Sequence, residues 1–242
     1  MSTSKFRIVV IVMLLCLFSF TITSYAANGR RGTGRGYFMV GYSQLNFDEL
    51  NNCLTAKGYP ELSNSLITLG GGGHAIINKF VIGGQGNAYL GSKEEAKIGD
   101  DRYETSIAAA AGFFNIGYLL YSKNGLCIYP LLGFGGGGMT MKIVDQTSPS
   151  FDEVLDNPKR NTSLTTGGFL LDVSVGMDYL IKMEEDENGY GGLVIGLRAG
   201  YTIALNKGDW ILETIEISGG PDIGITGPYV RLLFGGGGTS NY

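Results

Sequence analysis

The sequence predicts an all-β protein, an eight-stranded antiparallel up-and-down barrel that spans a membrane and carries short helices in the loops at one end. Three observations predict this fold. Long segments alternate between apolar residues and small or polar ones, there are eight such segments, and the connections between them are alternately long and short.

The alternation is clearest in the stretch FLLDVSVGMDYLI. Every odd position from Phe169 to Ile181 is apolar, whereas the even positions include Asp172 and Asp178. The next segment, from Leu193, repeats this scheme. Small and polar side chains cannot fill the core of a soluble barrel, but they suit a narrow lumen if the apolar face contacts lipid. The pattern therefore favours a membrane barrel, with a soluble periplasmic lipocalin-like barrel as the alternative fold.

The eight segments follow one another without a helix of comparable length between them. They cover about residues 36–45, 64–74, 79–91, 102–121, 125–144, 164–182, 190–206 and 225–235. Long connections follow the first, third, fifth and seventh segments, and short ones follow the second, fourth and sixth. An even strand number with tight turns at one end and longer loops at the other is typical of closed outer-membrane barrels.

The N-terminus has the three parts of a secretory signal. Lys5 and Arg7 precede an apolar core, and Ala26 marks the expected cleavage site. This core is shorter than the roughly 20 residues of a spanning helix, which argues against a membrane anchor. We expect a signal peptide over 1–26, a Gly/Arg-rich segment over 27–35, the barrel over 36–235 and a C-terminal tail over 236–242.

Glycine is unusually abundant, with 40 residues in 242, and it recurs in the runs TLGGGGHAI, GFGGGGMTM and LLFGGGGTS. In a narrow barrel we expect these glycines to clear interior volume and to ease the strong curvature of the strands. A phosphate-binding loop is not predicted, because the runs lack the Lys-Ser/Thr pair that such a loop needs.

The polar residues of the inward face form a candidate site in the lumen. We expect its members to be Gln85, Asn87, Asp172, Asp178, Arg198 and Arg231. An ion pair of Asp172 or Asp178 with Arg198, and a place for Arg231 near the closing seam, would compensate the buried charges. Such a lumen is either a plugged structural core or a small pore gated by exchangeable ion pairs.

Two of the long loops contain short amphipathic helices. NFDELNNCLTAKG and SFDEVLDNP each begin with a capping residue followed by an acidic residue three positions later. Their apolar faces, with a tryptophan of the last loop, are candidates for a cap over the barrel mouth, although they could merely stiffen the loops. The candidate cap residues are Phe47, Leu50, Phe151, Val154 and Trp210.

The sequence offers little catalytic chemistry. Its single histidine, His74, falls at a short turn, where a solvated or capping role is expected. No His, Cys or carboxylate cluster has metal-ligand spacing, Cys53 and Cys127 are expected near opposite ends, and no cofactor is predicted. The formal net charge of −4, about −6 without the signal, argues against nucleic acid as a partner.

The last segment, PYVRLLF, alternates toward a closing aromatic residue, Phe234. With the strand count and the loop alternation, it resembles the OmpA/OmpX-type outer-membrane barrels of Gram-negative bacteria. The resemblance implies an outer-membrane location, lipid around the barrel and insertion by the barrel assembly machinery. GGGGTSNY after Phe234 departs from the family's pattern, in which the aromatic residue usually ends the chain.

From these features we expect a structural or interaction role through the extracellular loops, without catalysis, toward an extracellular partner or a small ligand. The alternatives are a narrow pore or a barrel that binds a small or lipidic ligand, and, more remotely, a lipid A-modifying enzyme.

Overall fold

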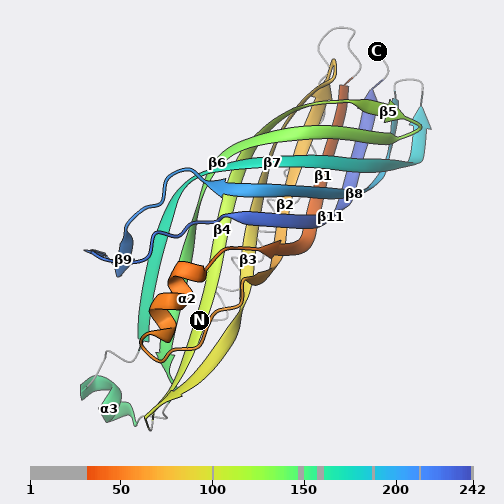
Figure 1. The fold of residues 1–242 in the computed structure, drawn as a ribbon. Helices are drawn as coiled ribbons and strands as arrows, with labels where there is room; N and C mark the ends of the chain where they lie inside the picture. Colours follow the sequence, from red (N-terminus) through yellow and green to blue (C-terminus); the bar gives the residue numbers. More distant parts are fainter. Residues whose placement is uncertain are drawn as a thin grey trace.

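Eight long antiparallel strands pair in a closed ring in the computed structural model, which describes residues 32–99, 101–146, 150–156, 161–186, 189–212 and 214–240 (Figure 1). The ring consists of β1 (Gly32–Gln44), β2 (Ser65–Ile77), β3 (Phe80–Ile98), β4 (Asp101–Tyr118), β6 (Leu126–Asp145), β7 (Asn161–Asp186), β8 (Gly189–Ala204) and β11 (Gly227–Ser240). Pairing of β11 with β1 closes it. The predicted eight-stranded antiparallel barrel is confirmed.

The smaller elements lie at the two ends of the barrel. The helices α2 (Asp48–Thr55) and α3 (Phe151–Asp156) belong to the long loops. The short strands β9 (Trp210–Leu212) and β10 (Ile215–Ile217) form a hairpin in the last long loop, and β9 also pairs with β7. The remaining strand, β5 (Tyr121–Lys123), extends a tight turn at the opposite end.

The register of the ring defines a narrow barrel. Starting at Thr33 of β1 and moving from each residue to its partner on the next strand, one turn around the ring ends at Ser43, also on β1. Ser43 lies ten residues further along the strand than Thr33. Eight strands with this stagger tilt by about 43° and enclose a backbone radius of about 8 Å. Such a lumen has room for side chains but not for a wide channel.

Two of the tight turns are built from residues that tolerate a left-handed backbone. Asn78 and Lys79 join β2 to β3 with φ of 49° and 76°, and Asn124 and Gly125 precede β6 with φ of 52° and 86°. Two consecutive positive φ angles are the geometry of a type I′ hairpin, whose twist matches that of the strands. These turns bring neighbouring strands into register at one end.

The barrel is taller on one side than on the other. Beyond the ends of β8, β11 and β1, the strands β3, β4, β6 and β7 continue toward the long loops, and α2 lies against these extended ends (Figure 1). The open side of this half-barrel is therefore filled by loop residues rather than by further strands.

The glycine runs lie within strands, and their residues alternate between the two faces of the wall. On the inner face, a Cβ at Gly72 would lie 3.0 Å from the Cβ of Gln85, so glycine clears interior volume there as expected. On the outer face, four glycines pair side by side on four neighbouring strands, namely Gly71, Gly86, Gly112 and Gly136. Half of the glycine pattern therefore shapes the exterior, which the sequence reasoning did not anticipate.

We expect alanine substitution to have opposite effects on the two faces. A Cβ at the inward Gly176 would lie 2.8 Å from Cζ of Tyr129, a fully buried ring, whereas a Cβ at the outward Gly86 would meet no atom within 4 Å. Gly176→Ala should destabilise the folded barrel by about 1–3 kcal/mol through overpacking. Gly86→Ala should be neutral or stabilise it by up to about 1 kcal/mol. Urea unfolding in lipid vesicles, followed by electrophoretic mobility, measures both; equal losses would contradict the assignment of faces.

The barrel wall extends beyond the boundaries expected from the sequence. β1 begins at Gly32 and so includes Arg35, which was assigned to the N-terminal segment. β11 continues past Phe234 to Ser240, because Gly235–Gly238 pair with β1 on one side and β8 on the other. Backbone hydrogen bonds on both sides hold a glycine run that side chains alone would not order.

Candidate functional site

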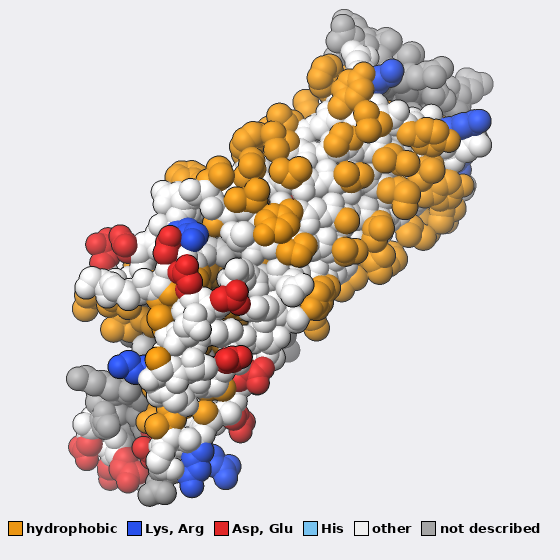
Figure 2. All heavy atoms as spheres, viewed as in Figure 1, with side chains coloured by type: hydrophobic (Ala, Val, Ile, Leu, Met, Phe, Trp, Pro, Cys, Tyr) orange, Lys and Arg blue, Asp and Glu red, His pale blue; other side chains and the backbone are white. Residues whose placement is uncertain are grey.

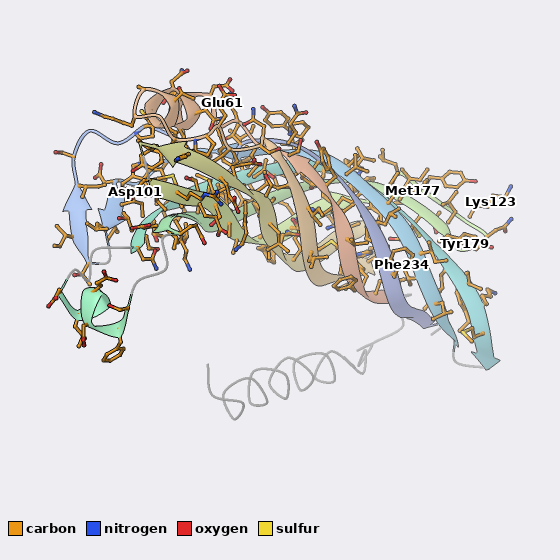
Figure 3. The ribbon with its side chains drawn as sticks, turned by 90° about the horizontal axis from the view of Figure 1, so that it is seen from below. Glu61, Asp101, Lys123, Met177, Tyr179 and Phe234 are labelled. Atoms are coloured by element: carbon orange, nitrogen blue, oxygen red, sulfur yellow. The ribbon has the colours of Figure 1, made fainter. Side chains whose placement is uncertain are left out.

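The outer face of the barrel carries a belt of large apolar side chains. On β7 alone it includes Phe169, Val173, Val175, Met177 and Tyr179, all of them exposed. Hydrophobic side chains cover the half of the molecule nearer the tight turns, whereas charged ones gather at the other end (Figure 2). Lys123, Met177, Tyr179 and Phe234 lie at the turn end and Glu61 and Asp101 at the loop end (Figure 3). An apolar exterior around a polar interior is the arrangement of a barrel in lipid.

The lower part of the lumen, near the tight turns, is organised around Asp178. Its carboxylate forms a buried salt bridge with Arg35 and accepts a hydrogen bond of 2.5 Å from the hydroxyl of Tyr129. Nε2 of His74 lies 3.5 Å from the same carboxylate, and Arg35 also donates to Sγ of Cys127 at 3.3 Å. Every one of these side chains is buried, so the pair is shielded from water.

Arg198 occupies the middle of the lumen. Its guanidinium donates to Oε1 of Gln85 at 2.7 Å and to the hydroxyl of Tyr37 at 2.8 Å. The expected ion pair of Arg198 with Asp172 or Asp178 is not formed. Arg35 pairs with Asp178 instead, because it belongs to a strand that continues further than the hydropathy pattern indicated.

The upper part of the lumen, toward the loops, contains Asp172 and Arg231. Asp172 accepts hydrogen bonds from Ser174 at 3.0 Å, Thr202 at 3.4 Å and Tyr229 at 2.9 Å. Arg231 donates to the hydroxyl of Tyr89 at 3.2 Å and lies 3.7 Å from the ring centre of Tyr229. The carboxylate is thus held by hydroxyl groups, and the guanidinium by aromatic rings.

The structure places all six expected lumen residues inside the barrel, where each is buried. Arg35, His74 and the inward tyrosines also lie in the lumen and were not among the residues expected there. His74 is not a solvated turn residue, because β2 continues to Ile77 and directs the imidazole inward, 3.2 Å from the hydroxyl of Tyr37. His74 is the last residue of the segment expected over 64–74 and shares the parity of the inward Leu66 and Thr68, so the alternation already indicated its direction.

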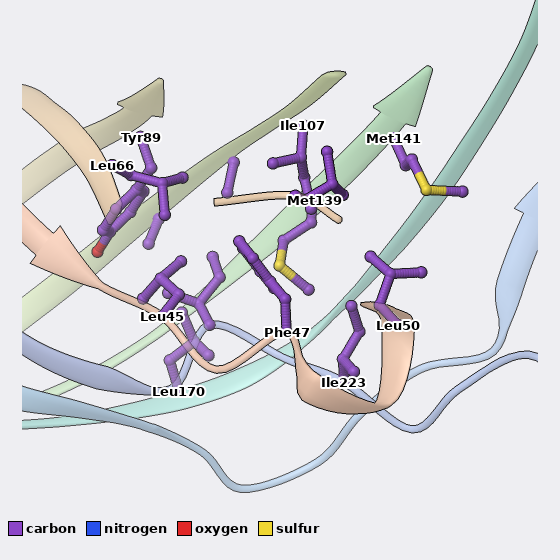
Figure 4. Packing of buried hydrophobic residues seen from close by; sticks show 14 of the residues in the cluster. Leu45, Phe47, Leu50, Leu66, Tyr89, Ile107, Met139, Met141, Leu170 and Ile223 are labelled. Carbon is purple, nitrogen blue, oxygen red and sulfur yellow. The ribbon is translucent and has the colours of Figure 1, made fainter. Parts of the chain in front are cut away.

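Loop residues close the mouth of the barrel. Phe47, Leu50 and Leu54 of the first loop are buried against Ile107 and Met139 of the wall (Figure 4). Trp210 of the last loop joins the same cluster and donates its indole N–H to the carbonyl of Pro221 at 2.9 Å. These contacts bring together three of the five candidate cap residues.

The second helix does not take part in this cap. Phe151 is 77 % exposed, and the side chain of Val154 lies outside the described residues. α3 does begin with the expected capping box, in which Ser150 N–H donates to Glu153 at 2.7 Å and Glu153 N–H donates to Ser150 at 3.3 Å. The box sets where the helix begins, but it does not determine which way the loop folds.

The described residues offer limited chemistry. They contain no cluster of three or more His, Cys, Asp or Glu side chains able to hold a metal ion. Within the same ranges, no helix has the length and hydropathy needed to cross a membrane. His74 is buried between Tyr37 and Tyr129, with ring centres 5.6 and 5.0 Å away. The arrangement can close the lumen and present the loops.

The two described cysteines provide a test of orientation. Both are free, Cys53 exposed on α2 and Cys127 buried in the lumen. We expect a membrane-impermeant maleimide to label Cys53 on intact cells and to leave Cys127 unmodified. Cys53→Ser should abolish the labelling and Cys127→Ser should preserve it; labelling that requires cell lysis would contradict extracellular loops.

Comparisons with known proteins gave structural matches only. No protein-family model matches the chain, and a search of curated proteins found no match. The chain is similar to Ail, the attachment invasion locus protein of Yersinia pestis, whose structure was solved in complex with the heparin analogue sucrose octasulfate. The TM-score is 0.41 at 10 % sequence identity, and the match covers 88 % of this chain and 99 % of Ail.

Two further structures match with lower TM-scores. For neisserial surface protein A the TM-score is 0.32, at 12 % identity and with coverage of 89 % of this chain and 100 % of that chain. For the outer membrane protease OmpT from Escherichia coli it is 0.34, at 9 % identity and with coverage of 88 % and 95 %. The strand ring and the apolar belt of the chain itself are features of an eight-stranded outer-membrane barrel.

Proposed function

We propose that the protein is a non-conducting, non-catalytic outer-membrane barrel that acts through its extracellular loops. The observation that carries this proposal is the closure of the lumen at two levels. The loop-end cluster fills the mouth, and a second cluster of Ile76, Val81, Cys127, Tyr129 and Leu131 fills the turn end. The Arg35–Asp178 pair lies within this second cluster, bonded to Cys127 and Tyr129, and the other inward polar groups are buried between it and the mouth. Such a filled lumen supports the barrel without offering a path to ions.

The chemistry of the loops supports an interaction role. Both loop helices expose acidic side chains, namely Asp48 and Glu49 on α2 and Asp152, Glu153 and Asp156 on α3. Such a surface attracts a cationic partner and repels a polyanion. A ligand such as the heparin analogue bound by Ail would meet like charge on these helices.

Two measurements test the proposal. In planar bilayers the purified barrel should show no discrete conductance steps, and such steps should appear only after the α2 loop is removed.

Intact cells that display the protein should retain a lysine-rich peptide but not heparin. Retention of the peptide should fall as the salt concentration is raised from about 0.05 to 0.5 M. Asp152→Asn together with Asp156→Asn should weaken retention. Steady conductance of the wild type, or binding of heparin, would refute the proposal.

A further inference from the structure

The lumen contains more positive than negative charge. Three guanidinium groups, those of Arg35, Arg198 and Arg231, share it with the two carboxylates of Asp172 and Asp178, and all five side chains are buried. Among the described lumen residues, Arg35 and Asp178 form the only salt bridge between an arginine and a carboxylate. Asp172 contacts the hydroxyl of the same Tyr229 whose ring lies against Arg231, but neither Arg198 nor Arg231 has a direct carboxylate partner. A buried cation without a paired counter-ion is unfavourable, and the five groups leave an excess of one positive charge.

Buried polar atoms without hydrogen-bond partners occur along the whole described lumen, and one group of them lies on Arg231 and its neighbouring strands. This group consists of Nε and Nη1 of Arg231, the side-chain amide of Asn87, Oγ1 of Thr68 and Oγ of Ser43. These residues belong to four neighbouring strands, β11, β1, β2 and β3, and glycines at two inward positions admit the side chains of Arg231 and Asn87. A Cβ at Gly41 would lie 2.8 Å from Cγ of Arg231, and one at Gly70 would lie 2.6 Å from Oδ1 of Asn87. Donors from several strands thus point into one region, as in an anion site.

Directly above this polar group the inner wall is apolar. Tyr89, whose hydroxyl contacts Arg231, belongs to the same buried cluster as Ile107, Met139 and Leu170 (Figure 4). The space between these walls is filled by side chains of the first loop. The loop contributes Leu45, Phe47, Leu50, Leu54 and Leu62 to the cluster.

The first loop is built as a unit that is bonded mainly to itself. The side chain of Asn51 donates to the carbonyl of Leu62 at 3.0 Å and accepts from its N–H at 2.8 Å. Asn64 accepts from the N–H groups of Phe47 at 3.3 Å and Leu45 at 2.8 Å.

Contacts with the rest of the barrel are mostly apolar. A hydrogen bond from Asn46 N–H to the carbonyl of Thr226 at 3.1 Å ties the base of the loop, and Tyr59 contacts the ring of Tyr103 edge-on. Movement of the loop away from the wall would therefore break few polar contacts, and an apolar chain of another molecule could replace those that are lost.

We propose that the mouth is a binding site for an amphipathic carboxylate, with α2 and its flanking residues as a displaceable plug. The alkyl chain takes the place of Phe47 and Leu50 between the apolar walls. The carboxylate accepts hydrogen bonds from Arg231 and Asn87 and supplies the missing negative charge. This site is independent of the loop-surface role proposed above.

Native mass spectrometry of the barrel in detergent tests the site with decanoate and decanol as probes. The folded wild type should bind one decanoate, and Arg231→Met should weaken this binding at least about tenfold. Decanol, which has the same chain without the charge, should bind more weakly and be insensitive to Arg231→Met. Phe47→Ala, which loosens the plug, should strengthen decanoate binding, whereas Phe151→Ala on α3 should leave it unchanged.

The heat-dependent shift in electrophoretic mobility identifies the folded fraction of each variant. If Arg231→Met does not fold, Asn87→Leu replaces it and should weaken decanoate binding in the same direction. Absence of saturable decanoate binding to the folded wild type, equal binding of the two probes, or unchanged binding by the folded Arg231 and Asn87 variants would overturn the proposal.

Discussion

Asp178→Asn is expected to lower the free energy of unfolding by about 3–5 kcal/mol, because it leaves the guanidinium of Arg35 buried without a counter-charge. The side chain of Asp178 is fully enclosed, and it also accepts the hydrogen bond from Tyr129. Asparagine keeps the shape and one acceptor oxygen, so the loss reports on charge rather than on packing. Urea titration of the barrel in lipid vesicles, with gel mobility as the readout, gives the difference.

A second substitution tests whether the unpaired charge of Arg35 causes the stability loss of Asp178→Asn. Arg35→Met in the Asp178→Asn background removes the unpaired cation and should recover part of the lost stability, since an uncharged pair in a closed lumen has no desolvation penalty. Asp152→Asn, on the exposed helix α3, should change stability by less than about 0.5 kcal/mol. A double variant less stable than Asp178→Asn alone would show that the two residues do not act as a pair.

Phe47→Ala is expected to destabilise the barrel by about 3–5 kcal/mol, the usual cost of removing a fully buried phenylalanine. Phe47 is 0 % exposed and lies at the centre of the loop-end cluster, among residues of the wall and of both packed loops. Its removal leaves a cavity that the curved strands cannot close, because their positions are set by hydrogen bonding around the whole ring.

Phe151→Ala is the matched control for Phe47→Ala. Both phenylalanines flank or begin a short amphipathic helix in a long loop, but only Phe47 is buried. The control should change stability by less than about 0.5 kcal/mol. Chemical unfolding of the two variants under the same conditions decides the point: equal losses would mean that α3 also packs on the barrel, contrary to the structure.

Alternation along each segment determined most of the fold in advance. A period of two assigns every residue of a strand to one face, so the inward direction of Asp172, Asp178, Arg198 and Arg231 followed from the sequence. The strand number and the end at which the loops lie followed from the spacing of the segments. The capping motif of α3 was also readable, because it involves residues three positions apart.

The partners of these residues were decided only by the tertiary structure. Which inward groups meet depends on the ten-residue stagger of the ring, which brings Arg35 of β1 beside Asp178 of β7, 143 positions further along the chain. Likewise, Phe47 and Phe151 follow similar local patterns, and only the uneven height of the wall makes one of them core and leaves the other exposed. Side-chain periodicity is a local property of the backbone, whereas stagger and loop packing arise from hydrogen bonds and contacts between strands that are distant in the sequence.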